Sequence, residues 1–187
     1  MRIIGSIEAR MGSSRLPGKT LMPILGDISL LECVVRRFTQ CKSVDAVVVA
    51  TSTNIKDDEI ADWCKKNNVH CFRGSENDVL DRVVSAANVY KADAIVQMGA
   101  DSAYLDYQLI DELIKQYKSG KYDYVCNDLK LTYPIGIYGH IVNMKVLTEL
   151  NLRHDLSNKD REDVVRYILE NSSQYKLFNV EAEAEYN

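Results

Sequence analysis

Three fixed cations fall within one glycine-containing segment near the start of the 187-residue chain. The segment reads Ala9-Arg10-Met11-Gly12-Ser13-Ser14-Arg15-Leu16-Pro17-Gly18-Lys19-Thr20. Small residues allow backbone N–H groups to approach anionic oxygens, while the cations Arg10, Arg15 and Lys19 supply positive charge. In a chain of net charge −4, this composition favours a phosphate-binding loop over a surface loop with solvated cations.

The glycine spacing separates this loop from two common nucleotide-binding motifs. A P-loop has about four residues between its first glycine and the Gly-Lys pair, whereas Gly12 and Gly18 enclose five. The G-x-G-x-x-G fingerprint of dinucleotide-binding folds does not occur either. Pro23, directly after Met22, argues against an α-helix that begins at Lys19. The loop is therefore predicted to bind a polyphosphate in another way.

Short apolar runs alternate with amphipathic segments in the first two thirds of the chain. Strands are predicted at residues 2–7, 46–51, 69–72, 93–98 and 122–126. Helices are predicted at residues 54–67, at 79–90 after a capping box at 75–78, and around 110–117 with Gly120 as C-cap. This alternation predicts an α/β fold with a mostly parallel sheet. The cationic loop follows the first strand, at the sheet edge where ligands bind in such folds.

The pattern changes after residue 127. Residues 132–143 are predicted to form an extended β ribbon, with helices at 144–150 and 158–171 and a last strand at 175–180. The sequence contains no repeat and no obvious interdomain linker, so residues 1–187 are expected to form a single domain.

Composition argues against several classes of protein. Lys and Arg total 23 against 27 Asp and Glu, without the basic excess of nucleic-acid-binding domains. No apolar run approaches the ~20 residues that span a membrane, and Glu8 interrupts the first run too early for a signal peptide. We therefore expect a cytoplasmic protein with no nucleic-acid or membrane partner. The five scattered cysteines are expected to be structural.

Residues 7–19 resemble the opening motif of the cytidylyltransferases that make CMP-activated sugars. That family includes the CMP-sialic acid and CMP-Kdo synthetases, and the resemblance is strongest to the branch of spore coat polysaccharide biosynthesis protein F. Residues 49–54, 72–82 and 122–127 match the same family in order and spacing.

The resemblance implies a Rossmann-like (GT-A-like) nucleotidyltransferase fold, a three-layer sandwich. It implies transfer of CMP from CTP to a sugar acid or related sugar for cell-surface polysaccharide, with release of pyrophosphate. Mg²⁺ would be the cofactor. The chain would form a homodimer, with residues 132–143 as dimerisation or acceptor-site ribbon.

The resemblance also implies roles for individual residues. Arg10 and Lys19 would be catalytic. The nucleotide would be bound by Ala9, Arg10, Met11, Gly12, Ser13, Ser14, Arg15, Lys19, Arg73, Ser75, Asp81 and Arg82. Asp101, which follows the strand at 93–98, would bind the metal. Without the resemblance, residues 75–82 would form only a capped helix with a surface pair of Asp81 and Arg82, and Asp101 would be a turn residue.

Two alternatives stay open. Ile135 and Tyr138 stand where this branch of the family carries acidic residues, which would suit a catalytically impaired nucleotide-binding module of a larger sugar-biosynthesis assembly. A loop that binds a triphosphate also does not identify the base, so another NTP could be the substrate.

Overall fold

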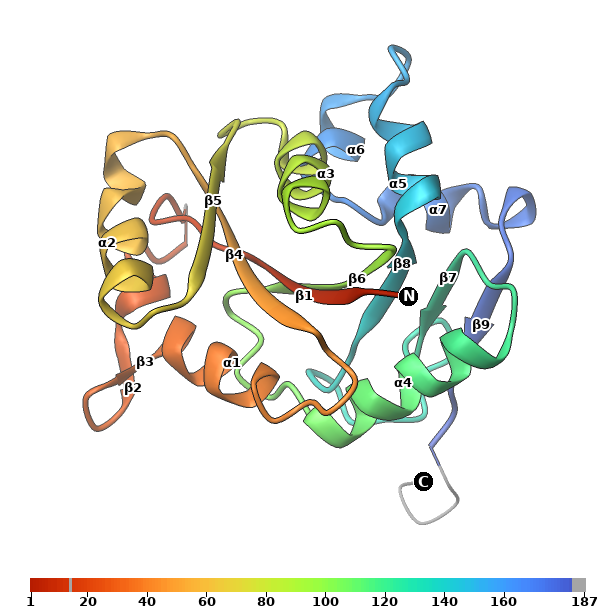
Figure 1. The fold of residues 1–187 in the computed structure, drawn as a ribbon, viewed down its shortest axis with the longest axis horizontal. Helices are drawn as coiled ribbons and strands as arrows, with labels where there is room; N and C mark the ends of the chain where they lie inside the picture. Colours follow the sequence, from red (N-terminus) through yellow and green to blue (C-terminus); the bar gives the residue numbers. More distant parts are fainter. Residues whose placement is uncertain (14, 183–187) are drawn as a thin grey trace.

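The computed structural model describes residues 1–13 and 15–182, and within them a seven-stranded sheet forms the centre (Figure 1). Its order is β5-β4-β1-β6-β8-β7-β9. The strands are β1 (Ile3–Glu8), β4 (Ala46–Ser52), β5 (His70–Gly74), β6 (Ala94–Gly99), β7 (Tyr124–Cys126), β8 (His140–Asn143) and β9 (Leu177–Asn179). β5, β4, β1 and β6 are parallel, β8 runs antiparallel to β6 and β7, and β9 is parallel to β7. The predicted, mostly parallel sheet is thus confirmed.

Helices cover both faces of this sheet. One core contains side chains of α1 (Leu30–Phe38), α2 (Asp58–Lys66) and α4 (Tyr107–Ser119). The other contains side chains of α3 (Val79–Val89), α5 (Met144–Asn151) and α7 (Arg166–Glu170), with α6 (Asn158–Glu162) beside α3. Figure 1 shows α3, α5, α6 and α7 together on one side of the sheet and α1 and α4 on the other. Side chains of β1 alternate between the two faces of the sheet, so Ile3 and Ile7 pack in the first core and Ile4 packs in the second. The α/β three-layer architecture is confirmed.

Several local features differ from the sequence predictions. Helix α1 and the small hairpin of β2 (Pro23–Leu25) and β3 (Ile28–Ser29) were not predicted. The helix expected over 158–171 is two helices, because Asp163 is extended and both following valines are buried. Asp78, not Ser75, caps α3 by accepting from the backbone N–H of Asp81 at 2.9 Å. Lys19 begins only a 3-10 turn, η1 (Lys19–Leu21); two similar turns are η2 (Ile55–Asp57) and η3 (Ser172–Gln174).

The segment predicted as a ribbon is a strand only at its end. Residues 132–139 form turns and irregular structure, and β8 lies inside the sheet. The Asn127 side chain stabilises this path, because it donates to the carbonyl of Ile137 at 3.0 Å and accepts from the backbone N–H of Gly139 at 2.9 Å. Since β8 is paired along both edges, it has no free edge for strand pairing between two chains.

Candidate active site

The cationic loop leaves the carboxyl end of β1 and is closed by hydrogen bonds to itself. The N–H groups of Ser13 and Gly18 both donate to the carbonyl of Met11, at 3.0 and 2.9 Å. The buried Thr20 hydroxyl donates to the carbonyl of Arg10 at 2.7 Å. Gly18 has φ +76°, a left-handed conformation that favours glycine. These contacts fix the backbone from which the three cations project.

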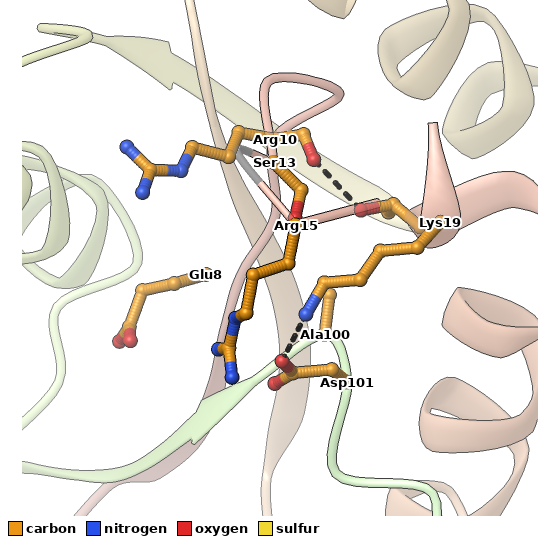
Figure 2. A pocket seen from close by; sticks show the side chains of 8 residues that line it. Glu8, Arg10, Ser13, Arg15, Lys19, Ala100 and Asp101 are labelled. Carbon is orange, nitrogen blue, oxygen red and sulfur yellow. Dashed lines mark hydrogen bonds and ion pairs between the residues drawn. The ribbon is translucent and has the colours of Figure 1, made fainter. Parts of the chain in front are cut away.

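The loop forms one wall of a pocket of about 210 Å³. The pocket is lined by Glu8, Arg10, Ser13, Arg15, Lys19, Thr20, Ala100 and Asp101. In Figure 2 the heads of Arg15 and Lys19 point toward Asp101, and Lys19 Nζ forms an ion pair with the Asp101 carboxylate. Asp101 follows β6, the strand beside β1. The parallel pair β1–β6 therefore brings together residues that are 82 positions apart.

Arg10 points to the opposite side of the pocket in Figure 2, away from Lys19. Its Nη2 lies 3.3 Å from Glu162 Oε1 at the end of α6. Arg10 and Glu162 also line a second cavity of about 420 Å³, together with Glu76, Asn77 and Asn158. Arg10 is thus shared by the two cavities, and a ligand that extends from one to the other would pass it.

Of the residues predicted to hold the triphosphate, the pocket contains Arg10, Ser13, Arg15 and Lys19, with the predicted metal ligand Asp101 opposite. The side chain of Ala9 is buried in the core beneath the loop. Met11 is held through its N–H, which donates to Asp57 Oδ1 at 2.7 Å. Gly12 does not line the pocket, and Ser14 lies outside the described residues.

The predicted base and ribose residues lie around the loop between β5 and α3, where they contact protein atoms. Arg73 donates to the carbonyls of Ser52 and Asn54 at 2.9 and 3.0 Å. Arg82 is only 2% exposed and donates to the carbonyl of Ser75. Asp81 Oδ1 accepts from Asn151 at 3.1 Å.

The buried Arg82 contradicts the alternative of a surface pair of Asp81 and Arg82. The same loop presents Glu76 and Asn77 to the second cavity. These two residues were not predicted as site residues, although they lie inside the matched segment 72–82.

Three residues of the pocket were not predicted from the sequence, Glu8, Thr20 and Ala100, and Glu8 is the ionisable one. Its Oε2 accepts a hydrogen bond from Gln97 Nε2 at 2.6 Å, and its Oε1 is buried without a partner among the described residues. Burial raises the pKa of Glu8 to about 8, although the bond from Gln97 and the charge of Arg82 lower it. The sequence feature that could have identified Glu8 is its position as one acidic residue at the end of an apolar strand, directly before the cationic loop.

Asp101 suits a divalent metal. The side chain is 48% exposed at the pocket, and Mg²⁺ in nucleotide sites is typically bound by one or two carboxylates together with phosphate oxygens. The described residues contain no group of three acidic, histidine or cysteine side chains that could hold a metal ion. Asp101 therefore fits a metal ion that is bound by this carboxylate together with the oxygens of a polyphosphate.

A model of the family described as Cytidylyltransferase matches residues 4–185. The chain belongs to the cytidylyltransferase family. The spore coat polysaccharide biosynthesis protein SpsF of Bacillus subtilis is 36% identical over 186 residues, which are 96% of this chain and 75% of the relative. The solved structure of a cytidylyltransferase from Leptospira borgpetersenii is 33% identical with a TM-score of 0.90, over 98% of this chain and 77% of that one.

A further relative aligns with a shorter part of the chain. The 3-deoxy-manno-octulosonate cytidylyltransferase of Chlamydia felis is 31% identical over 118 residues, 60% of this chain and 44% of the relative. The family and enzyme class predicted from residues 7–19 are therefore confirmed. Among the described residues, no helix of this cytidylyltransferase is long and apolar enough to cross a membrane.

Proposed function

We propose that this cytidylyltransferase transfers CMP from CTP to a sugar acid or a related sugar and releases pyrophosphate. The observation that carries the proposal is the pocket in which Arg10, Arg15 and Lys19 lie opposite the carboxylate of Asp101. Three cations beside one carboxylate match a triphosphate with a divalent metal. The sugar acid is proposed because the Chlamydia felis relative is a 3-deoxy-manno-octulosonate cytidylyltransferase.

In the reaction, a hydroxyl oxygen of the acceptor forms a bond to the α-phosphorus and loses its proton to solvent. The bond from the α-phosphorus to the pyrophosphate oxygen breaks. Lys19 and Arg15 would stabilise the charge that gathers on the α-phosphate and on the pyrophosphate, while Arg10 would orient the triphosphate. Asp101 would hold Mg²⁺, which supplies further charge neutralisation when bound.

The cytidine would extend past Arg10 toward Glu76 and Asn77. Both are polar residues of the loop between β5 and α3 and line the second cavity. Arg82 would position this loop through the carbonyl of Ser75, and Arg73 would fix the end of β5 through the carbonyls of Ser52 and Asn54. Base recognition would thus depend indirectly on the predicted residues Arg73, Ser75, Asp81 and Arg82.

The test is pyrophosphate release from each of CTP, UTP, GTP and ATP, with Mg²⁺ and 3-deoxy-manno-octulosonate as acceptor. We expect release with CTP, and a loss of about 100-fold or more in Lys19→Ala. Lys118→Ala, which removes an exposed cation from α4, is the matched control. Release with a different NTP would identify a different nucleotidyltransferase. CTP binding without release would favour the nucleotide-binding module, if related sugar acids also fail as acceptors.

A cytoplasmic homodimer remains part of the proposal. Residues 132–139 include Ile135, which is 92% exposed, and Tyr104 nearby is 71% exposed. These apolar side chains, rather than β8, would provide the contact between two chains. Light scattering that gives the mass of one chain at high concentration would contradict the dimer.

A further inference from the structure

A chain of hydrogen bonds crosses four neighbouring strands and ends at Glu8 in the pocket. Asp128, just after β7, bonds through Oδ2 to His140 Nε2 at 2.8 Å. His140 Nδ1, on β8, lies 3.2 Å from Gln97 Oε1 on β6. Gln97 Nε2 then donates to Glu8 Oε2 on β1 at 2.6 Å. The chain thus links the region after β7 to the triphosphate pocket.

Aromatic contacts hold the middle of this chain in place. The His140 ring contacts Tyr124, with centroids 5.7 Å apart, and Tyr138, with centroids 5.3 Å apart. The His140 side chain is only 12% exposed. A ring packed in this way fixes the Gln97 amide, and the amide fixes the Glu8 carboxyl.

The bond from Gln97 decides which Glu8 oxygen can carry a proton. Because Oε2 accepts from the amide, the proton of a neutral carboxyl belongs on Oε1, the buried atom without a partner among the described residues. A bound phosphate would be repelled by a carboxylate in the same pocket, whereas a carboxylic acid donates a hydrogen bond to it. Glu8 thus has the geometry of a donor in a pocket whose other charged side chains are three cations and the Asp101 carboxylate.

Charged groups from three neighbouring parts of the fold act on Glu8. Arg82 of α3 lowers its pKa, while Asp163 between α6 and α7 and Asp101 after β6 raise it. His140 is linked to Glu8 by the hydrogen bonds of Gln97. The loop cations line the same pocket. Burial outweighs these charges and raises the pKa of Glu8 to about 8, so the acid is the main form at neutral pH.

We propose that Glu8 binds substrate as a carboxylic acid whose Oε1 donates a hydrogen bond to an anionic oxygen in the pocket, with Gln97 and His140 as positioning residues. This inference rests on the proposed function, because that function supplies the anion. The shared location with Arg10, Arg15 and Lys19 favours a nucleotide phosphate. The carboxylate of a sugar acid is the other source of the same chemistry.

The test measures proton uptake when pyrophosphate or CTP binds, by calorimetry in buffers of different ionisation enthalpy. With a pKa of about 8, wild type should take up about 0.8 proton more than Glu8→Gln at pH 8.5, and about 0.1 more at pH 7. Glu8→Leu should weaken pyrophosphate binding about tenfold, and Glu8→Gln should weaken it less because the amide can still donate. Thermal melts check that each variant is folded.

The positioning role of His140 is tested by the pH dependence of proton uptake. His140→Phe keeps an aromatic ring next to Tyr124 and Tyr138 but removes the bond to Gln97. The midpoint of Glu8-dependent proton uptake should then move by about half a pH unit or more. A midpoint equal to that of wild type would contradict the positioning role.

The outcomes separate this inference from the proposed function. Glu8-dependent uptake with pyrophosphate, but no CTP binding, supports the inference and overturns the proposed function. If CTP binds but wild type and Glu8→Gln take up the same number of protons, the inference fails and the proposed function stands. The exception is Glu8-dependent proton uptake that appears only when 3-deoxy-manno-octulosonate is added. That result supports the inference and identifies the acceptor carboxylate as the anion. Failure of both pyrophosphate and CTP to bind overturns both.

Discussion

Replacing Glu8 by glutamine should stabilise the protein increasingly as the pH rises. In the folded chain the pKa of Glu8 is raised from 4.5 to about 8, chiefly because burial penalises the charged carboxylate. The folded state thus binds a proton that the unfolded state has released between these two values. The contribution of protonated Glu8 to the stability of the folded state is fully present below pH 4.5. It is lost as the pH rises through about 8. Glutamine occupies the same volume but does not ionise.

The magnitude follows from the two pKa values. One pKa unit corresponds to about 1.4 kcal/mol. Ionisation of Glu8 therefore reduces the free energy of unfolding by roughly 1 kcal/mol at pH 5 and at most roughly 4 kcal/mol at pH 8. Relaxation and water entry reduce such values, so we expect the advantage of Glu8→Gln to grow by about 1–3 kcal/mol between pH 5 and pH 8.

Urea unfolding of wild type and Glu8→Gln at pH 5.0, 6.5 and 8.0 measures this difference. The control is Glu112→Gln on α4, since hydrogen bonds from Gln116 and Lys115 lower the pKa of Glu112. That variant should show no advantage that grows with pH. A difference between wild type and Glu8→Gln that is the same at all three pH values would refute the argument from burial.

Three further substitutions test the metal ligand, the ion pair of Arg10 and the packing of α4. Asp101→Asn should raise the Mg²⁺ concentration needed for half-maximal CTP binding by about tenfold, measured by Mg²⁺ titration; an unchanged requirement would exclude Asp101 as the ligand. Glu162→Gln should free Arg10 from its ion pair and tighten CTP binding by about threefold by calorimetry, in the range of an exposed pair; weaker binding would contradict this. Gly139→Ala should reduce the free energy of unfolding by about 1–3 kcal/mol, because a Cβ there would overlap side chains of α4; unaltered urea unfolding would show that α4 can adjust.

The position of the phosphate pocket could be predicted because it depends on local patterns. An apolar strand followed by a loop with two glycines and three cations places that loop at the carboxyl edge of a parallel sheet. Asp101 could be placed there for the same reason, since it follows another buried strand. Helix α1 was also readable, because Leu31, Val34, Val35 and Phe38 form one apolar stripe.

The environment of Glu8 could not be predicted from such patterns. Its contact with Gln97 joins residues 89 positions apart, and that of Gln97 with His140 joins residues 43 apart. Both depend on strand order and register, since β8 enters the sheet antiparallel beside β6. The burial of Arg82 and the break at Asp163 likewise result from packing between α3, α6 and α7 rather than from local preference.

Calorimetric titration of CTP, UTP, GTP and ATP in the presence of Mg²⁺, with wild type and Lys19→Ala side by side, tests whether the cationic loop forms a CTP site. We expect selective binding of CTP by wild type, weakened about tenfold or more when the Lys19 ammonium is removed from the pocket. Selective binding of another nucleotide, or CTP binding that Lys19→Ala leaves unchanged, would contradict it.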